Sequence, residues 1–260
     1  RYGDAGKVAA ECDVTVAGLG INKSIEREGQ DRFSLELPID QQEFIKELYK
    51  VNPNTVVVLV AGSSLAVNWM DENVPAILNA WYPGEQGGNA VAEVLFGDYN
   101  PGGRLPLTYY NSLDEIPAFD NYSVKGRTYQ YFEGQPLYEF GYGLSYTKFR
   151  YKSKGVNVEQ DTVKVSFEVS NTGKYDGDEV AQVYVKYPET GTYMPLKQLH
   201  GFKRVHIKKG KTSKVTVGVP KKDLRYWDEQ ERKFVTPKGE YTFMVGASSE
   251  DIKFRETVGL

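Results

Sequence analysis

Two short apolar runs, VTVAGLG at residues 14–20 and TVVVLV at residues 55–60, each lead into glycine and polar residues. Short apolar runs of this kind are typical of buried strands, and the β-branched run at 55–60 is expected in a central parallel strand that is covered on both faces. We therefore predict two buried strands, with polar loops at residues 21–36 and 62–64 leaving their carboxyl ends.

Helical patterns alternate with these strands. After the first loop, Asp40 stands at the position of an N-cap and Glu43 follows in capping-box position, before apolar residues that recur at helical spacing. A third strand is expected at residues 76–81, and a second helix at about 86–96. This alternation of strands and helices predicts a layered α/β domain over residues 1–110.

The second half of the chain has a different pattern. Residues 111–148 are rich in tyrosine and turn formers without clear periodicity, which predicts an ordered connector. From residue 149 to residue 260, short alternating strands with glycine-containing turns between them predict an antiparallel β-sandwich. The most regular of these strands are expected at residues 163–169, 180–185, 214–217 and 240–245.

Composition narrows the class of partner. The 260 residues include 32 basic and 35 acidic side chains, so the net charge of -3 gives no field that attracts nucleic acid or an anionic membrane. No apolar run reaches the about 18 residues of a membrane span. The chain starts with neither Met nor a signal peptide, so we expect it to begin within a longer protein. From this charge balance we expect a neutral partner. The 19 tyrosines are compatible both with packing in β-strands and with stacking on sugar rings.

The spacing of reactive residues excludes several common kinds of site. His200 and His206 have no cysteine or acidic pair at ligand spacing, and Cys12 is the single cysteine, so we expect no metal site and no internal disulfide. The EQGG sequence at residues 85–88 lacks the Lys-Ser/Thr of a P-loop. Ser63 is not part of a G-x-S-x-G motif, and the α/β half has no histidine to serve as its base.

Charged residues gather in the loop after the first predicted strand: Glu26, Arg27, Glu28, Asp31 and Arg32. Ligands of open α/β sheets bind outside the carboxyl ends of the strands, which is where this loop is expected. Neighbouring carboxylates and arginines in such a loop can hold one carboxyl group protonated, as a general acid requires. A charged loop is more often only a solvated loop, so the spacing alone leaves both interpretations open.

Three blocks of sequence, in this order, resemble glycoside hydrolase family 3 over almost the whole chain. IEREGQDR at 25–32 with LELP at 35–38 looks like the acid/base loop of that family. The most specific block is WYPGEQGG at 81–88 with LFGDYNPGGRLP at 95–106, and FGYGLSYT at 140–147 resembles the entry to the family's fibronectin type III-like domain.

The resemblance implies a three-part enzyme without a cofactor. An N-terminal (β/α)8 barrel would supply an aspartate nucleophile, either from the same precursor or from a separate chain. The α/β domain, partial at its N-terminus here, would supply the acid/base, and a fibronectin type III-like sandwich would follow. Such enzymes are retaining exo-glycosidases, whose two carboxyl groups stand about 5–5.5 Å apart.

The family pattern also implies roles for single residues. The acid/base glutamate aligns with Glu26, and Glu28 is the alternative because loops of this kind vary in length. Arg27, Glu28 and Tyr129 would contact the substrate, whereas Asp31 and Arg32 would stabilise the loop.

The loop and residues 126–134 look more like β-xylosidases of the bacterial and plant type than like fungal β-glucosidases. The expected substrate is thus an oligosaccharide or aryl glycoside with a terminal, non-reducing β-linked xylose. A β-glucosidase, an α-L-arabinofuranosidase and a non-catalytic carbohydrate-binding or scaffold module remain alternatives. Without a barrel we expect the chain to be inactive. The compartment stays open, with a periplasmic or secreted location favoured over the cytoplasm.

Overall fold

The computed structural model describes residues 3–260, which form two compact units. Within the described residues, the α/β unit comprises residues 3–96, 109–118 and 134–137. The sandwich unit comprises residues 97–108, 119–133 and 138–260. Both units use parts of the predicted connector, so the predicted domain boundaries at residues 110 and 148 remain a proposal. Within the described residues, no helix is long and apolar enough to cross a membrane.

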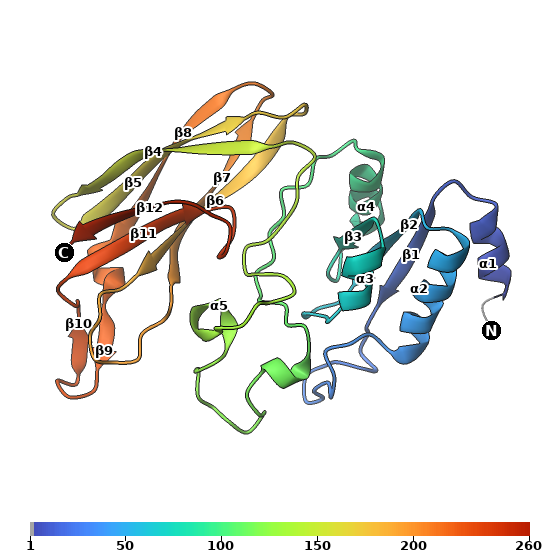
Figure 1. Cartoon of the computed structure of the whole chain (residues 1–260), viewed down its shortest axis with the longest axis horizontal. Coiled ribbons are helices and arrows are strands. Elements are labelled where there is room, and N and C mark those ends of the chain that lie inside the picture. Colours follow the sequence, from blue (N-terminus) through green and yellow to red (C-terminus); the bar gives the residue numbers. More distant parts are fainter. Residues whose placement is uncertain (1–2) are drawn as a thin grey trace. The chain divides into compact units, whose positions relative to one another are not determined.

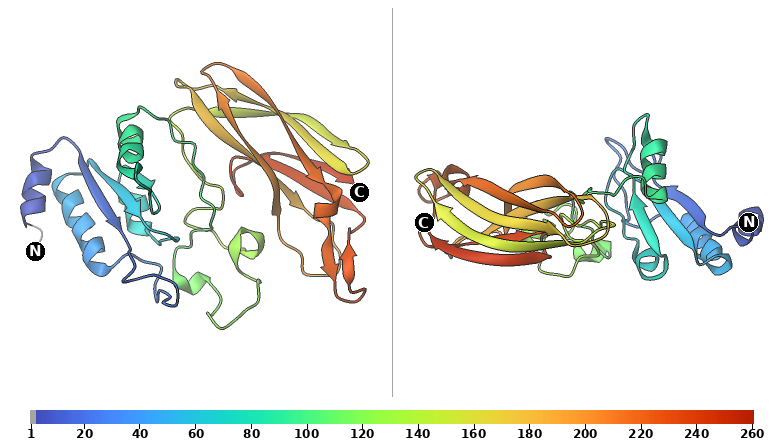
Figure 2. Two further views of the ribbon diagram at one scale, coloured as in Figure 1. Left: turned by 180° about the vertical axis from the view of Figure 1, so that it is seen from behind. Right: turned by 90° about the horizontal axis from the view of Figure 1, so that it is seen from above.

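The α/β unit is built on a three-stranded parallel sheet in the order β1-β2-β3. In Figures 1 and 2 this sheet lies between α2 and α4. The elements are α1 (Gly3–Ala10), β1 (Thr15–Gly20), α2 (Ile39–Val51), β2 (Thr55–Val60), α3 (Asn68–Asn73), β3 (Ala76–Asn79), α4 (Gly87–Phe96) and the 3-10 turn η1 (Leu113–Glu115).

The two strands that were predicted from their apolar runs differ in burial. β2 is buried as expected, with Val57 and Leu59 at most 3% exposed. β1 buries Ala17 and Leu19 on one face, but Val16 on the other face is 53% exposed. β1, predicted as a buried strand, is therefore buried on one face only, and it lies at the edge of the sheet.

Helix α2 begins differently from the prediction. Pro38 occupies the N-cap without a side-chain hydrogen bond, and Asp40 lies in the first turn, so the predicted Asp40 cap is wrong. A negative side chain in the first turn still favours the helix through its dipole. The amide of Gln41 has a different role, because it accepts from Gly20 N at 2.9 Å and donates to Gly20 O at 2.8 Å. Helix α2 thus holds the last residue of β1.

The sandwich unit contains two antiparallel sheets, in the orders β12-β11-β6-β7 and β4-β5-β8. Figure 2 shows their strands gathered in two layers, and the side chains between them form a closed core that includes Phe167, Val183 and Phe243, each at most 1% exposed. The elements are α5 (Thr128–Tyr131), β4 (Phe149–Val158), β5 (Thr162–Asn171), β6 (Gly177–Lys186), β7 (Gln198–Ile207), β8 (Thr212–Pro220), the turn η2 (Lys221–Leu224), the hairpin β9 (Tyr226–Asp228) and β10 (Lys233–Val235), β11 (Glu240–Gly246) and β12 (Ile252–Gly259).

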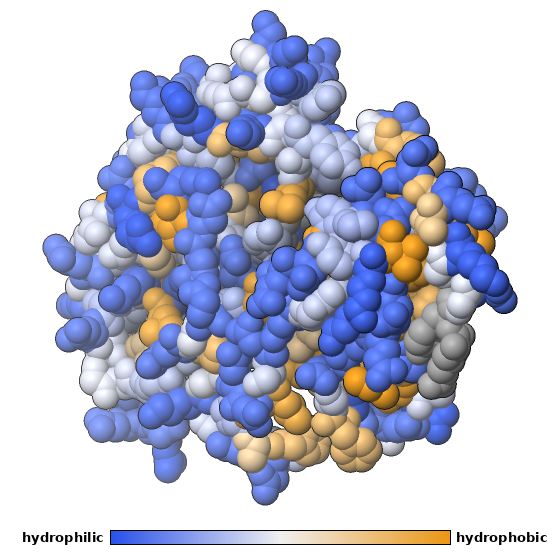
Figure 3. Space-filling model, turned by 45° about the vertical axis from the view of Figure 1, so that its right-hand side comes forward, coloured by the Kyte–Doolittle hydropathy of each residue, from blue (hydrophilic) through white to orange (hydrophobic). Residues whose placement is uncertain are grey.

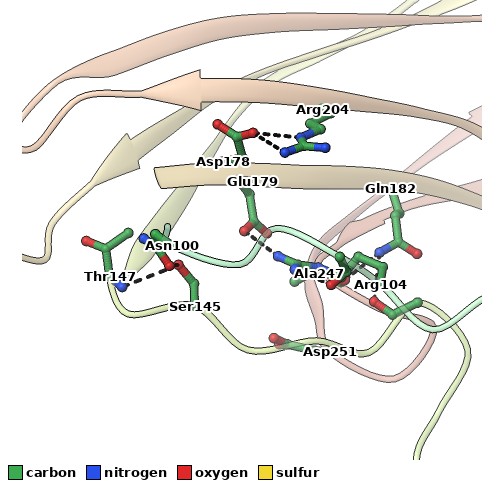
Figure 4. A network of polar contacts seen from close by, with 12 residues as sticks. Asn100, Arg104, Ser145, Thr147, Asp178, Glu179, Gln182, Arg204, Ala247 and Asp251 are labelled. Carbon is green, nitrogen blue, oxygen red and sulfur yellow. Dashed lines mark hydrogen bonds and ion pairs between the residues drawn. The ribbon is translucent and has the colours of Figure 1, made fainter. Parts of the chain in front are cut away.

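A buried ion pair attaches residues 97–108 to this sandwich. Arg104 Nη2 donates to Glu179 Oε2 at 2.8 Å, and their side chains are 9% and 3% exposed (Figure 4). Tyr151 donates its hydroxyl to the other oxygen of Glu179 at 2.7 Å, and burial raises the pKa of Tyr151 so that it keeps this proton. Both oxygens of the buried carboxylate therefore have a donor, as a charge removed from water requires.

Candidate active site

The predicted acid/base loop, residues 21–36, is fixed at both ends to the carboxyl edge of the sheet. At its start, Ile21 N donates to Val60 O at 3.1 Å, which continues the pairing of β1 with β2. At its end, Ala66 N donates to Leu35 O at 2.8 Å. The loop thus spans the ends of two neighbouring strands, where ligands of open α/β sheets collect.

Two successive turns shape this loop. Ile25 N and Glu26 N both donate to Asn22 O, at 2.9 and 3.0 Å. A tighter turn follows, in which Arg27 and Gln30 exchange backbone hydrogen bonds of 3.2 and 3.0 Å. Gly29 sits inside this turn with φ of 74°, a conformation that glycine adopts without strain. Glu28 and Gly29 are therefore the two central residues of the turn.

Glu26 is the anchor of the loop. Its Oε2 atom lies 2.8 Å from Arg32 Nε and also accepts from the hydroxyl of Ser63, which follows β2. Arg32 is 10% exposed and donates from Nη2 to Ser64 O at 2.8 Å. The sequence pattern around Ser63 was weighed only for a nucleophile and did not predict this contact. The sequence did contain a hint of it. Ser63 follows the strand β2, which neighbours β1, and the loop begins at the end of β1.

The other charged residues of the loop point to solvent. Glu28, Arg27 and Asp31 are exposed, and across residues 3–260 the side chains of Glu28 and Asp31 have neither a hydrogen bond nor an ion pair. Phe33, directly after Arg32, is 96% exposed. The structure therefore brings Arg32 to Glu26 and leaves Glu28 accessible at the tip of the turn.

A buried phenol lies close to this anchor. Tyr109 is 3% exposed, and its hydroxyl accepts a hydrogen bond of 2.9 Å from Asn79, the last residue of β3. Burial raises the pKa of Tyr109 to about 12, although the Asn79 hydrogen bond and the charge of Arg32 lower it. Tyr109 therefore stays neutral at ordinary pH and cannot act as a base.

Tyr129, predicted to contact substrate, belongs to the sandwich unit. Its ring stacks on Phe140 with 4.3 Å between centroids, and its hydroxyl accepts from Leu199 N at 3.0 Å. The histidines lie there too: His200 Nε2 pairs with the Tyr187 hydroxyl at 2.8 Å, and His206 Nδ1 with Asp178 Oδ1 at 2.7 Å. A substrate role for Tyr129 stays a prediction.

A family model described as the glycosyl hydrolase family 3 C-terminal domain matches residues 2–146, more than half of the chain. The chain belongs to glycosyl hydrolase family 3. A second model, described as a fibronectin type III-like domain, matches residues 179–249 in the sandwich unit. The resemblance read from the three sequence blocks is confirmed, and so is the fold of an α/β domain followed by an all-β sandwich.

Relatives within family 3 carry two different activity names. A xylan 1,4-beta-xylosidase of Xylanibacter ruminicola is 43% identical over 225 residues, which are 86% of this chain and 26% of that protein. A beta-glucosidase of Kluyveromyces marxianus is 37% identical over 264 residues, covering 96% of this chain and 31% of that protein. The chain thus spans about a quarter to a third of the length of these relatives.

Solved structures give the same family. The beta-glucosidase of Kluyveromyces marxianus in complex with glucose has a TM-score of 0.92 and 36% identity, covering 100% of this chain and 33% of that chain. The GH3 beta-glucosidase of Bifidobacterium adolescentis has a TM-score of 0.91 and 33% identity, covering 100% of this chain and 40% of that chain.

Proposed function

We propose that this chain supplies the general acid/base of a retaining exo-β-glycosidase, whose aspartate nucleophile lies on a (β/α)8 barrel outside the chain. The main support is the position of Glu28, exposed on a tight turn that Glu26, Arg32 and Ser63 hold in place. The acid/base carboxyl group of such an enzyme stands about 5–5.5 Å from the nucleophile carboxyl group and must reach the leaving oxygen of a sugar. An accessible carboxyl group on a fixed turn is suited to reach such an oxygen.

The geometry gives a reason to prefer Glu28 over Glu26 as this group. Oε2 of Glu26 accepts from the guanidinium of Arg32 and from the hydroxyl of Ser63, which are parts of the loop's own support. A proton donor has to present its proton to the substrate. Both oxygens of Glu28 are free to do so, whereas Glu26 could offer only Oε1, because its Oε2 belongs to the anchor. Glu26, which the family pattern favours, becomes the alternative.

The remaining loop residues take supporting roles in this proposal. Arg32 holds Glu26 and the backbone of Ser64, which suits its predicted role in stabilising the loop. Arg27 flanks Glu28 in the turn and is exposed, so a contact with a sugar hydroxyl remains part of the proposal. Asp31 has no side-chain partner within residues 3–260, so its predicted stabilising role rests on the family pattern alone.

Exchange of each glutamate for glutamine in the complete enzyme tests the proposal. Glu28→Gln should lower kcat/KM about 10²- to 10⁴-fold on glycosides with poor leaving groups, because these need protonation. Dinitrophenyl glycosides should suffer far less, and azide should then yield the glycosyl azide. Glu26→Gln should lower activity on both substrates without azide rescue. Glu11→Gln, an exposed exchange on the turn after α1, is the control. Azide rescue of Glu26→Gln alone would return the role to Glu26.

For the substrate we propose a terminal β-linked xylose, with β-glucosidase activity as the second candidate. The 43% identity to a xylan 1,4-beta-xylosidase, against 37% to a beta-glucosidase, supports this order. A pocket that excludes the extra hydroxymethyl group of glucose is worth about 10- to 200-fold. The ratio of kcat/KM for 4-nitrophenyl β-xyloside and β-glucoside measures it, and a ratio below one would reverse the assignment.

Exposed apolar side chains support contact of the α/β unit with a further domain. Val16 on β1, Phe33 in the loop and Phe96 at the end of α4 are 53%, 96% and 84% exposed. Figure 3 shows apolar residues in separate groups on one face of the molecule. Parallel strands are normally covered on both faces, and the bare face of β1 departs from that rule. We propose the barrel as the cover.

A further inference from the structure

Tyr82 joins the two strand ends that support the proposed acid/base loop. Its hydroxyl donates to Ile21 O at 3.2 Å, at the first residue of the loop. Its ring lies against Gly62, because a Cβ atom built on Gly62 would stand 2.5 Å from Tyr82 Cε2. Gly62 directly precedes Ser63, whose hydroxyl binds Glu26. One side chain therefore contacts both the origin of the loop and the backbone next to its anchor.

The backbone around Tyr82 determines where this side chain goes. Trp81 has φ of 55°, a left-handed conformation that is an outlier for a bulky residue. Pro83 follows and restricts Tyr82 to extended backbone angles. Pro83 itself packs on Gly87 at the start of α4, where a Cβ atom would lie 2.4 Å from Pro83 Cβ. Unfavourable conformations of this kind persist where the surrounding structure requires them, often at functional sites.

We propose that Tyr82 is a positioning residue for the proposed acid/base, an inference that rests on the proposed function. By holding Ile21 and covering Gly62, Tyr82 fixes where the loop leaves β1 relative to Ser63, and hence where the turn with Glu28 stands. Tyr82 is 53% exposed, so the core of the α/β unit depends little on it. Its loss should affect the rate of proton transfer far more than stability.

Tyr82→Phe in the complete enzyme removes only the hydroxyl that holds Ile21. We expect kcat/KM to fall about tenfold for glycosides with poor leaving groups, the effect of one lost hydrogen bond on positioning. Dinitrophenyl glycosides should lose less than about threefold, since they need little protonation. KM and the melting temperature should not change. The limb of the pH profile that reports the general acid should shift. Tyr175→Phe, which alters a tyrosine 60% exposed in the sandwich unit, should change none of these quantities.

A second pair of variants tests the contact with the ring. Gly62→Ala should reproduce the Tyr82→Phe behaviour, because the added methyl group displaces the ring. Gly84→Ala is the matched control, since a Cβ atom there would meet nothing within 4 Å. In a Tyr82→Ala background, where no ring remains to be displaced, Gly62→Ala should have no further effect.

The outcomes separate this inference from the function on which it rests. The inference is overturned if Tyr82→Phe and Gly62→Ala keep the wild-type dependence on leaving group while Glu28→Gln makes that dependence steeper. If exchange of Glu28 and of Glu26 both leave that dependence unchanged, the proposed function fails first, and the role of Tyr82 fails with it.

Discussion

Two glutamates of this chain, Glu26 and Glu179, each pair with an arginine. The two pairs differ in how far the glutamate is buried. Glu26 and Arg32 are 25% and 10% exposed, and Oε1 of Glu26 has no hydrogen bond among the described residues. Glu179 and Arg104 are 3% and 9% exposed, and both oxygens of Glu179 have donors. The Glu179 pair is the more deeply buried of the two, and a buried pair is sensitive to the loss of one partner.

Arg104→Met should therefore destabilise the sandwich unit. The change leaves Glu179 buried without its positive partner, and the free energy of unfolding should fall by about 3–5 kcal/mol. Urea unfolding of the 260-residue chain, followed by circular dichroism, measures it. Arg150→Met on the exposed side of β4 is the control and should stay within about 0.5 kcal/mol. Equal midpoints for the two variants would contradict a structural role for the buried pair.

At the level of elements, the junction of β1, β2 and α2 fixes where the proposed acid/base loop begins. A Cβ atom on Gly20 would lie 1.8 Å from Val60 O, inside the paired strands. Gln41 of α2 meanwhile bonds both backbone groups of Gly20. Glycine at this position lets the two strand ends approach closely enough for the loop to cross from one to the other.

Gly20→Ala should separate the ends of β1 and β2. We expect the α/β unit to lose about 3 kcal/mol or more, because the clash is with backbone and cannot be relieved by a side-chain rotation. Gly18→Ala in the same strand adds a methyl group that meets nothing within 4 Å, and it should be neutral. Thermal unfolding of both variants tests the difference, and a stable Gly20→Ala protein would show that β1 shifts freely.

The strands with continuous apolar runs were predicted from their own residues. The run at 55–60 became β2 because its β-branched residues pack on both faces. The strand predicted at 76–81 ends instead at Asn79, since Trp81 turns into left-handed backbone. β7 and β12 were not predicted. Both strands carry several charged residues, and their place in a sheet depends on pairing with β6 and β11.

The same distinction applies to the candidate site. The sequence placed the loop at the carboxyl end of β1 and proposed Arg32 as its support, and in the structure Arg32 pairs with Glu26. It did not find Ser63 or Tyr82 as partners, because both contacts depend on how β1, β2 and β3 align. It placed Glu26 ahead of Glu28 and did not predict their difference in exposure, which arises from the closing of the turn at Arg27 and Gln30.

At the scale of the whole molecule, we expect the 260-residue chain alone to hydrolyse no aryl β-xyloside or β-glucoside. A retaining mechanism needs a nucleophile besides the acid/base. Release of 4-nitrophenol by the purified chain is the measurement. Turnover that Glu28→Gln abolishes would show that the chain is catalytic by itself. Binding of xylose or glucose to the chain alone, measured by calorimetry, would instead favour a carbohydrate-binding module.

The two units alternate along the chain: residues 97–108 belong to the sandwich, and residues 109–118 return to the α/β unit. Arg104 therefore comes before residues 109–118 of the α/β unit in the sequence, whereas its partner Glu179 comes after them. In genetic terms, a recombination event that moved the sandwich as one block from residue 119 onward would separate the pair and leave Glu179 buried alone. Because segments of the two units alternate in the sequence, the sandwich can be exchanged intact only together with residues 97–118.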